Sequence, residues 1–238
     1  MKGRLFWPVV YGYYLALPSF QHRRLDRMGF GEFLSIEPFW IDLALVQELR
    51  GRWDSRSGAF LFPWGHMTPT LEDVTRLTGL RVHGAALSGH SYTDYRHLVE
   101  SYLGFSPSGE GALWSIDRSE FFFAVGLSGL HRGPEEPIVS FCARVAGRLR
   151  GTLASSEGPQ ADLDLRRFLF LLWEKVLFAS LADSLSCRLL VFLDDLDVIG
   201  SFSWGAALLA HLRTDMATAQ RGAAGTPRFT PFLQVCFN

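Results

Sequence analysis

The sequence predicts a mainly α-helical fold, with a single helical domain and one small β-hairpin near residues 58–69. Three observations lead to this prediction. Apolar residues recur at helical spacing in most segments, several segments carry helix start and stop signals, and turn-forming extended sequence is concentrated in one short stretch. The chain has 238 residues, of which 48% are hydrophobic and 14% aromatic. It is therefore long and apolar enough to bury a substantial core.

The first 22 residues form an apolar leader whose role the sequence leaves open. After Lys2 and Arg4 the run LFWPVVYGYYLALPSF is uncharged, which resembles a secretory signal. Pro8 and Gly12 interrupt this run, no small-residue cleavage site follows, and a membrane span needs about 20 apolar residues. We therefore expect a packed segment or a non-native leader rather than a secretory signal, and no membrane partner. The domain itself is expected over residues 23–238.

The first helix expected in the domain lies in IEPFWIDLALVQELRGRW, with Gly51 as its stop. GAFLFP and HMTPT then form two extended pieces around Trp64 and Gly65. Pro63 fixes one backbone angle and Gly65 tolerates a positive φ, which is typical of a tight turn. These features predict the hairpin.

A short helix follows the hairpin. Thr70 and Asp73 have the spacing of a capping box, Leu71 and Val74 lie on its apolar face, and Gly79 stands where a left-handed C-terminal residue belongs. Each residue of this segment thus has a local structural role.

The middle of the chain is expected to be helical with one internal loop. YTDYRHLVESYLG ends at a glycine, Asp117 with Glu120 begins another helix, and IVSFCARVAGRLRG forms a third. Residues 152–162 form the loop, and a long apolar helix runs from 163 to about 182. Lys175 in that helix is expected to be exposed or to snorkel rather than to act as a catalytic amine.

The last third predicts a helix that begins near Trp204. Ser201 or Ser203 can cap it, and Gly222 can end it. Its expected apolar face consists of Trp204, Ala207, Leu208, His211 and Leu212. We expect Trp204 to be buried, because the small residues that follow it let a neighbouring segment approach closely.

Composition narrows the classes of function. The net charge of −1 gives no overall attraction to nucleic acid or anionic lipid. Two arginine sets still leave a nucleic-acid-binding module open: Arg23, Arg24 and Arg27, and Arg144, Arg148 and Arg150. The three cysteines Cys142, Cys187 and Cys236 are widely spaced, which predicts buried thiols in a reducing compartment.

Candidate catalytic and metal-binding residues each have a simpler structural interpretation. Asp194, Asp195 and Asp197 could hold Mg²⁺ or Mn²⁺, but we favour a solvated acidic turn before a helix, with Asp194 and Asp197 on one helical face. His83, His90 and His97 recur every seven residues without the spacing of a zinc site. His66 is expected in a turn or a partner contact, and His211 in the core. We expect no cofactor and no metal.

Two blocks carry a resemblance to a known family. FLFPWGHMTPTLEDVTRLTGLRVHGAALSGH resembles the first signature of the plant mobile domain: an extended strand, a Gly-x-Met-Thr turn, a Thr-Leu-x-Asp-Val helix and a Gly-Leu-x-Val-x-Gly exit. DDLDVIGSFSWGAALLAHLRTDM resembles the second signature. The similarity extends from about Met28 to Gln234. The end FLQVCFN departs from the family's longer C-terminal segment, so the C-terminus could be truncated.

The resemblance implies a mainly helical plant domain found in transposable elements and in host proteins similar to the maintenance-of-meristems proteins. Those proteins are nuclear and act in transposon silencing, gene expression and genome integrity, and some members work with a phosphoprotein phosphatase. The family is also labelled aminotransferase-like. The residues do not support that label, because Lys175 is the sole interior lysine and no phosphate-binding glycine loop accompanies it.

The sequence therefore predicts a non-enzymatic nuclear interaction domain in a transposon-silencing, transcription or genome-maintenance complex that supports meristem maintenance. The alternatives are a transposon-derived nucleic-acid-binding module, a metal-dependent enzyme using Asp194–Asp197, and a cytoplasmic location. The family-signature residues proposed for interaction are Trp64, Gly65, His66, Met67, Thr68, Thr70, Leu71, Asp73, Val74, Gly79, Asp195, Asp197, Gly200, Trp204, Gly205 and His211.

Overall fold

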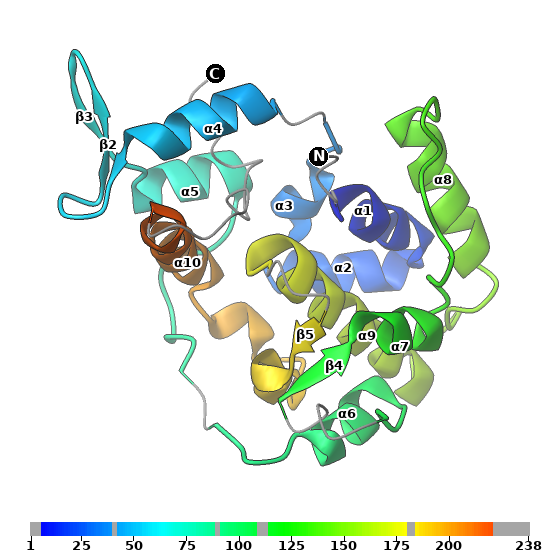
Figure 1. Ribbon diagram of the computed structural model, residues 1–238. Coiled ribbons are helices and arrows are strands. Elements are labelled where there is room, and N and C mark those ends of the chain that lie inside the picture. The colour runs from blue at the N-terminus through cyan, green and yellow to red at the C-terminus, as the bar shows by residue number, and fades with distance from the viewer. Residues whose placement is uncertain (1–5, 40–41, 89–90, 109–113, 180–183, 221–238) are drawn as a thin grey trace.

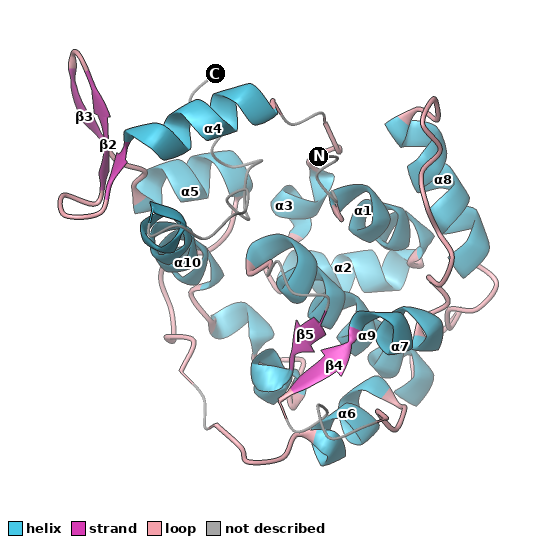
Figure 2. Cartoon of the chain, viewed as in Figure 1, coloured by secondary structure: helices cyan, strands magenta, loops and turns pink. Residues whose placement is uncertain are grey.

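A computed structural model describes residues 6–39, 42–88, 91–108, 114–179 and 184–220. Helices make up most of it, with two small antiparallel sheets, as Figures 1 and 2 show. The mainly α fold class with a small hairpin is confirmed. The α-helices are α1 Trp7–Ala16, α2 Ser19–Arg27, α3 Gly31–Ser35, α4 Leu43–Arg52, α5 Leu71–Thr78, α6 Arg96–Leu103, α7 Arg118–Ala124, α8 Ile138–Leu149, α9 Pro159–Leu172 and α10 Trp204–Gln220.

Shorter elements connect these helices. One sheet has the order β1 (Trp53–Asp54), β2 (Ala59–Phe62) and β3 (Gly65–Met67), and the other pairs β4 (Ser115–Asp117) with β5 (Ser184–Ser186). A π-helical turn, η2 (Trp173–Leu177), continues α9. Two 3₁₀ helices, η3 (Cys187–Leu193) and η4 (Ile199–Ser201), lead to α10.

The core is built around α9, whose residues 168–172 are fully buried together with Trp173. In Figure 1 this helix lies among α1, α2, α6 and α7, while α8 covers one side. The C-terminal part of α9, which is apolar on every side, needs cover all round, and these neighbours supply it.

The N-terminal apolar run is part of this core. Helix α1 lies against α8 so closely that a Cβ on Gly12 would come within 2.6 Å of the Val145 Cβ. The Cys142 thiol donates to the carbonyl of Pro8 at 3.3 Å, and the Tyr13 hydroxyl to that of Asp164 at 3.4 Å. Residues 7–16 thus pack as a structural helix, which is the first of the two alternatives expected for this run.

Gly51 was wrongly expected to end its helix. Helix α4 begins after Asp42, whose carboxylate accepts the amide hydrogens of Ala44 and Leu45 at 2.9 and 3.1 Å, and it continues through Gly51 to Arg52. The chain then enters β1 directly, where Trp53 pairs with Phe60. The predicted hairpin is therefore a three-stranded sheet, because β1 adds to its inner edge.

Two boundaries around α9 were also wrong. The helix begins at Pro159, four residues before the predicted start, because proline suits the first helical turn. At the other end the α-helix gives way to the π-turn at Trp173 and stops by Phe178. Residues 180–182, which the prediction included, lie outside the described part.

Lys175 is buried rather than exposed, with 5% of its surface accessible. Its ammonium group lies 5.3 Å from the centre of the Phe6 ring, a cation–π contact. Neighbouring Glu174 is also buried and accepts the amide hydrogen of Ser186 at 2.8 Å. The segment was expected to leave one side open to water, but Phe6 and β5 cover it.

Candidate functional site

The two signature blocks meet in one backbone joint. The amide of Gly205 donates to the Arg81 carbonyl at 2.7 Å, and the Arg81 guanidinium donates to the Gly200 carbonyl at 2.7 Å. A Cβ on Gly205 would lie 3.0 Å from the carbonyl oxygens of both Leu80 and Arg81. Glycine at this position therefore allows α10 to begin directly against the exit of α5.

A second set of hydrogen bonds extends the joint. Ala85 pairs with Phe202 in a parallel bridge, its amide donates to the Ser201 carbonyl at 2.9 Å, and its carbonyl accepts the Ser203 amide at 2.9 Å. A Cβ on Gly84, which has φ +126°, would meet the Ser201 oxygen at 2.2 Å. The glycine-containing exit of the first block is thus shaped to receive the second block.

The expected side-chain cap of α10 was wrong. The Ser203 hydroxyl donates to the Ala85 carbonyl at 3.0 Å, and the Ser201 hydroxyl donates to the Val198 carbonyl at 2.6 Å. Both hydroxyls thus serve the joint and the turn before it. The start at Trp204 is nevertheless as predicted.

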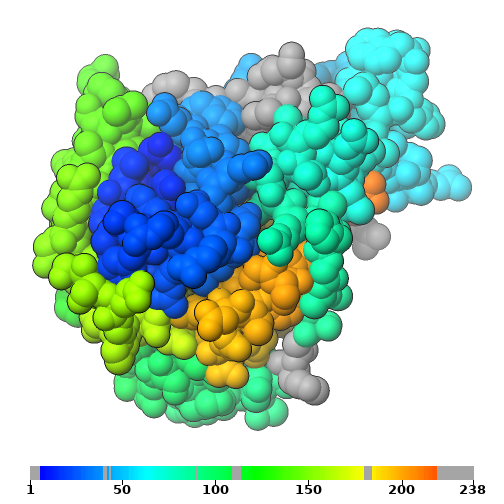
Figure 3. All heavy atoms as spheres, turned by 180° about the vertical axis from the view of Figure 1, so that it is seen from behind, coloured from blue at the N-terminus to red at the C-terminus, as the bar shows by residue number. Residues whose placement is uncertain are grey.

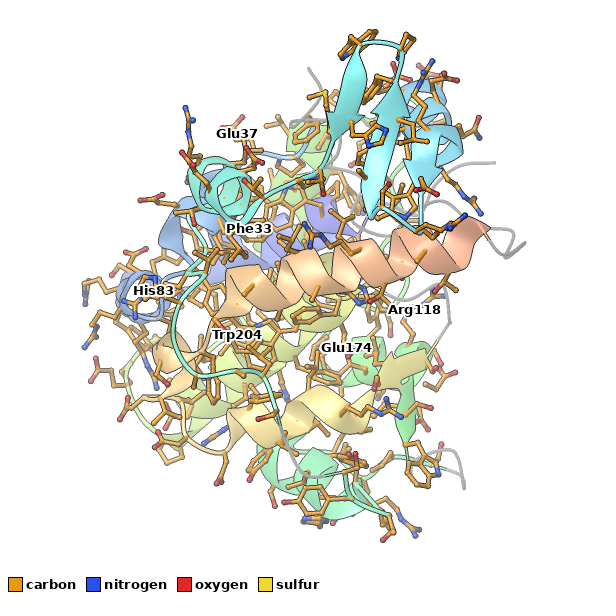
Figure 4. All side chains as sticks on the ribbon, turned by 90° about the vertical axis from the view of Figure 1, so that its left-hand side faces the viewer. Phe33, Glu37, His83, Arg118, Glu174 and Trp204 are labelled. Atoms are coloured by element: carbon orange, nitrogen blue, oxygen red, sulfur yellow. The ribbon has the colours of Figure 1, made fainter. Side chains whose placement is uncertain are left out.

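Trp204 is buried, as predicted, with 2% of its surface exposed. Its indole nitrogen donates to the Ile199 carbonyl at 2.8 Å, and its ring stacks on Trp173. Figure 4 shows it under the first half of α10. This signature residue therefore joins α10 to α9 and is not available to a partner.

Helix α5 follows its sequence signals closely. Thr70 and Asp73 form the reciprocal capping box, and Gly79 has the left-handed φ of 66°. Hydrogen bonds from the Thr70 side chain and backbone lower the pKa of Asp73 below its usual range. Val74 is fully buried. These four signature residues build the helix rather than a surface.

Most of the exposed apolar side chains of the signatures lie on the hairpin. Leu71, which was wrongly expected on the buried apolar face of α5, is also 43% exposed. Leu61, Phe62, Trp64, His66 and Met67 form what we call the hairpin surface. Trp64 is 75% exposed, Met67 43% and Leu61 41%, whereas Phe60 of the same hairpin is buried. The hairpin projects from the body in Figure 1 and, seen from behind, in Figure 3.

The hairpin surface is ordered by its own contacts. The rings of Phe62 and Trp64 stack with centroids 4.9 Å apart and planes inclined by 11°, and the Arg52 guanidinium lies 5.3 Å from the Phe62 ring centre. Leu61 pairs with His66 across the strands. Successive strand residues face opposite sides, so apolar side chains are presented on both faces of the hairpin.

The base of the hairpin is tied to the rest of the domain. The Thr68 hydroxyl donates to the Gly58 carbonyl at 2.9 Å, and Arg213 of α10 donates to the Thr68 hydroxyl at 3.3 Å and the Pro69 carbonyl at 3.1 Å. Among the described residues β3 pairs only with β2, so its outer edge is free. The hairpin is an anchored projection with an open strand edge.

The acidic cluster does not have the helical arrangement that was expected. Asp194 follows η3 and accepts the Tyr102 hydroxyl at 2.7 Å, while Asp195 accepts the amide of Asp197 at 2.8 Å in a local turn. Burial and the Asp194 contact raise the pKa of Tyr102 to about 12. Within the described ranges no three potential metal-ligating side chains converge.

The histidines are dispersed. His66 and His83 are exposed, His97 lies on α6 beside the Tyr92 ring, and His90 falls outside the described residues. His211 is half-buried on α10, with its Nε2 3.8 Å from the Asp215 Oδ2. The seven-residue recurrence therefore does not gather His83 and His97 into a ligand set.

The described cysteines are buried, as predicted. Burial raises the pKa of the Cys142 thiol to about 11, and burial together with nearby Glu174 raises that of Cys187 to about 12. Both thiols stay protonated at neutral pH, which suits packing rather than nucleophilic attack. Cys236 lies outside the described residues.

Two members of the hairpin surface were not singled out from the sequence. Leu61 and Phe62 read as ordinary strand residues. Leu61 lies on the opposite face of β2 from buried Phe60, whereas Phe62 lies on the same face as Phe60, nearer the turn, and is only partly buried. The alternation of side chains along the two strands was the available signal. It shows which side chains share a face of the hairpin, but the sequence does not show which face packs on the core.

Comparison with known proteins places these features in a family. The plant mobile domain family model matches residues 29–235. Protein MAIN-LIKE 2 of Arabidopsis thaliana is 30% identical over 196 residues, which cover 82% of this chain and 26% of that protein. Protein MAINTENANCE OF MERISTEMS of the same plant is 26% identical over 200 residues, covering 83% of this chain and 37% of that protein.

A third relative is a serine/threonine-protein phosphatase 7 long form homolog from Arabidopsis thaliana, 28% identical over 187 residues. The match covers 78% of this chain but 12% of that protein. The chain thus spans between about a tenth and two fifths of the length of these relatives.

No solved structure gives a significant match. None of the helices in the described ranges is both long and apolar enough to cross a bilayer. With both signatures joined in one fold and most of its length matched, the chain belongs to the plant mobile domain family.

Proposed function

We propose that this domain is a non-enzymatic interaction domain that works in the nucleus, within a complex for transposon silencing, transcription or genome maintenance that supports meristems. The hairpin surface is its partner contact. The observation that carries this proposal is the exposure of Trp64, 75% of whose surface meets solvent at the tip of a projecting hairpin.

An exposed tryptophan of this kind suits protein recognition. Tryptophan is enriched among the few residues that dominate binding energy at interfaces. Here the stack on Phe62 holds the indole in place before any partner arrives, which reduces the entropy lost on binding. The open edge of β3 offers backbone groups to an added strand beside it.

The remaining signature residues support a scaffold rather than a catalyst. Trp204, Gly205 and Gly79 hold helices together. The candidate acids are also engaged: Asp194 accepts the Tyr102 hydroxyl, and Asp195 accepts the amide of Asp197. Lys175 is buried against Phe6, away from the position that an aldimine-forming lysine would need in an accessible site.

The names of the relatives guide the choice of partner. One relative is named for the maintenance of meristems, and another is a phosphatase homolog that contains a region similar to this chain. A domain that occurs within a phosphatase and also apart from one could bind a phosphatase in trans. We therefore propose a nuclear phosphoprotein phosphatase as one partner.

The test is a pull-down from plant nuclei with three versions of the chain: wild type, Trp64→Ala and Trp114→Ala. Trp114 is also an exposed tryptophan, at 55%, but lies outside the hairpin, which makes it the matched control. We expect wild type and Trp114→Ala to recover the same phosphatase or silencing factors and Trp64→Ala to lose them, with equal melting temperatures. Equal recovery by Trp64→Ala would refute the hairpin surface as the contact.

The structure weakens the nucleic-acid alternative at both arginine sets. Arg24 forms an ion pair with Asp162 at 2.6 Å, and Arg144 forms one with Glu136 at 2.8 Å. Each set therefore has one arginine already neutralised by an acid. Binding to single- or double-stranded DNA that falls steeply with salt would favour the alternative, whereas salt-insensitive protein binding favours the scaffold.

A further inference from the structure

A pocket of about 310 Å³ opens beside α10, next to the signature residue His211. It is lined by side chains from segments far apart in the sequence, including Tyr95, Phe178, Arg188, Phe192, Ala207 and His211. Figure 4 shows α10 lying alongside η3, with the segment that follows α5 crossing near both. The hairpin surface contributes no residue to this pocket.

The inner wall of the pocket is aromatic. Tyr95 is 1% exposed and Phe192 is 9% exposed, so both rings are fixed by the core behind them. Phe178 meets the His211 ring edge-on, with centroids 5.6 Å apart and an interplanar angle of 88°. Such walls favour a flat apolar group, which gains burial and ring contacts together.

The rim of the pocket is cationic. Arg188 is exposed, and its guanidinium has no hydrogen bond or ion pair with any residue in the described ranges, although its backbone amide donates to Ser186. No aspartate or glutamate is among the described residues that line the pocket. His211 faces Asp215 across 3.8 Å, but Asp215 is not part of the lining.

We infer that this pocket binds a small aromatic carboxylate. The ring would lie among Tyr95, Phe178 and Phe192, and the carboxylate would accept hydrogen bonds from the Arg188 guanidinium, whose planar fork matches it. The volume is at the small end of the range for ligand sites, which fits one ring and a short acidic arm. This site is independent of the interaction proposed for the hairpin.

Calorimetric titration with 3-phenylpropionate, and with its neutral analogue 3-phenylpropan-1-ol, tests the assignment. We expect the acid to bind about tenfold more tightly than the alcohol, since Arg188 is exposed and its charge is partly screened. Arg188→Gln should remove this preference. Arg148→Gln is the control, because Arg148 is an exposed arginine on α8, outside the pocket lining.

A second variant tests the aromatic wall. Ala207→Leu keeps a good helix former in α10 and places a larger side chain in the pocket, so it should abolish binding of both probes while the protein stays folded. Amide resonances of Ser91, Arg188 and Ala207 should shift when 3-phenylpropionate is added to the wild type. Equal binding of acid and alcohol, unchanged binding by Arg188→Gln or Ala207→Leu, or no binding at millimolar concentration would each overturn the inference.

One further arm distinguishes the source of the carboxylate. N-acetylglycyl-phenylalanine carries the same ring and acid at a peptide C-terminus. We expect it to bind no more tightly than 3-phenylpropionate, because the pocket holds little more than the ring and its acid. Binding at least tenfold tighter than 3-phenylpropionate, and lost in the C-terminal amide, would assign the pocket to a protein C-terminus and overturn the small-molecule assignment.

Discussion

The indole of Trp204 stacks on the indole of Trp173, with ring centroids 4.4 Å apart and planes inclined by 20°. Trp173 is the first residue of the π-turn that ends α9, and Trp204 is the first residue of α10. The two rings therefore connect the central helix to the helix that carries the second family signature. Since both side chains are almost fully buried, the contact stabilises the fold and is closed to partners.

Replacement of Trp204 by alanine should destabilise the domain by about 3–5 kcal/mol, because it removes the stack, the hydrogen bond to Ile199 and a large buried volume. Urea unfolding followed by circular dichroism measures the change. Trp114→Ala is the control and should stay within about 0.5 kcal/mol of wild type, since Trp114 is exposed. Equal unfolding midpoints for Trp204→Ala and wild type would contradict the proposed structural role.

Loss of the α5 cap should have a smaller effect. Thr70→Ala removes the acceptor of the Asp73 amide hydrogen and should cost about 1 kcal/mol. Thr75→Ala in the same helix is the control, because Thr75 is exposed and, within the described ranges, its hydroxyl forms a hydrogen bond only with the Leu71 carbonyl. If both variants lose the same free energy of unfolding, the effect belongs to helix composition and not to the cap.

Gly79→Val should cost more than Thr70→Ala. The residue has φ 66°, which a β-branched side chain resists, and a Cβ would also lie 2.4 Å from the Glu32 Cβ. The same unfolding measurement decides this order. A Gly79→Val protein as stable as wild type would show that the left-handed conformation is absent in solution.

The sequence predicted α5 well because its signals are local. Thr70, Asp73 and Gly79 specify the start and end of the helix within ten residues, and the structure confirms each. Trp204 was also placed correctly, since the small residues after it imply a close neighbour. The two-residue strand β1 was missed because Trp53 and Asp54 are too few residues to show the alternation of apolar and polar side chains that marks a strand. They form a strand only by pairing with β2.

Long-range contacts account for the error at Lys175, whereas Pro159 was a local helix-start signal that the prediction missed. FLFLLWEKVLF has the same pattern whether Lys175 faces water or the Phe6 ring, so only the tertiary structure reveals its burial. The same limit applies to the candidate site. The sequence identified the motif residues, but it could not show that those around Gly205 are buried in a joint while Trp64 is exposed on the hairpin, because burial depends on which elements cover each residue.

Burial of Glu174 should make stability depend on pH. Burial raises the pKa of Glu174 from 4.5 to about 7, partly offset by the Ser186 amide and Lys175. The folded state therefore holds this proton more tightly than the unfolded chain, so stability falls as pH rises from about 4.5 to about 7. Glu174→Gln keeps an acceptor for the Ser186 amide but has no carboxyl group to titrate, so it should lack this pH dependence. The difference in free energy of unfolding between Glu174→Gln and wild type should therefore shift in favour of the variant by up to about 3 kcal/mol between pH 4.5 and pH 8.

Unfolding of the wild type and Glu174→Gln at several pH values between 4.5 and 8 measures the difference. Glu100→Gln is the control, because Glu100 is exposed on α6. Parallel pH profiles for wild type and Glu174→Gln would show that Glu174 titrates normally in the folded protein.

Two helical glycines should respond to alanine in opposite directions. Gly147 on α8 is exposed, and apart from its chain neighbours and the backbone of α8 itself no atom of the described residues lies within 4 Å of the position that an alanine methyl group would take. Gly147→Ala should therefore stabilise the domain by about 0.5–1 kcal/mol through helix propensity. At Gly205 the methyl group would lie 3.0 Å from the Leu80 and Arg81 carbonyl oxygens. The Arg81 carbonyl cannot retreat without losing its 2.7 Å hydrogen bond from the Gly205 amide, so Gly205→Ala should cost about 1–3 kcal/mol. Thermal and urea unfolding of the two variants in parallel measures both signs. Stabilisation by Gly205→Ala equal to that of Gly147→Ala would mean that the two signature blocks do not approach each other this closely in solution.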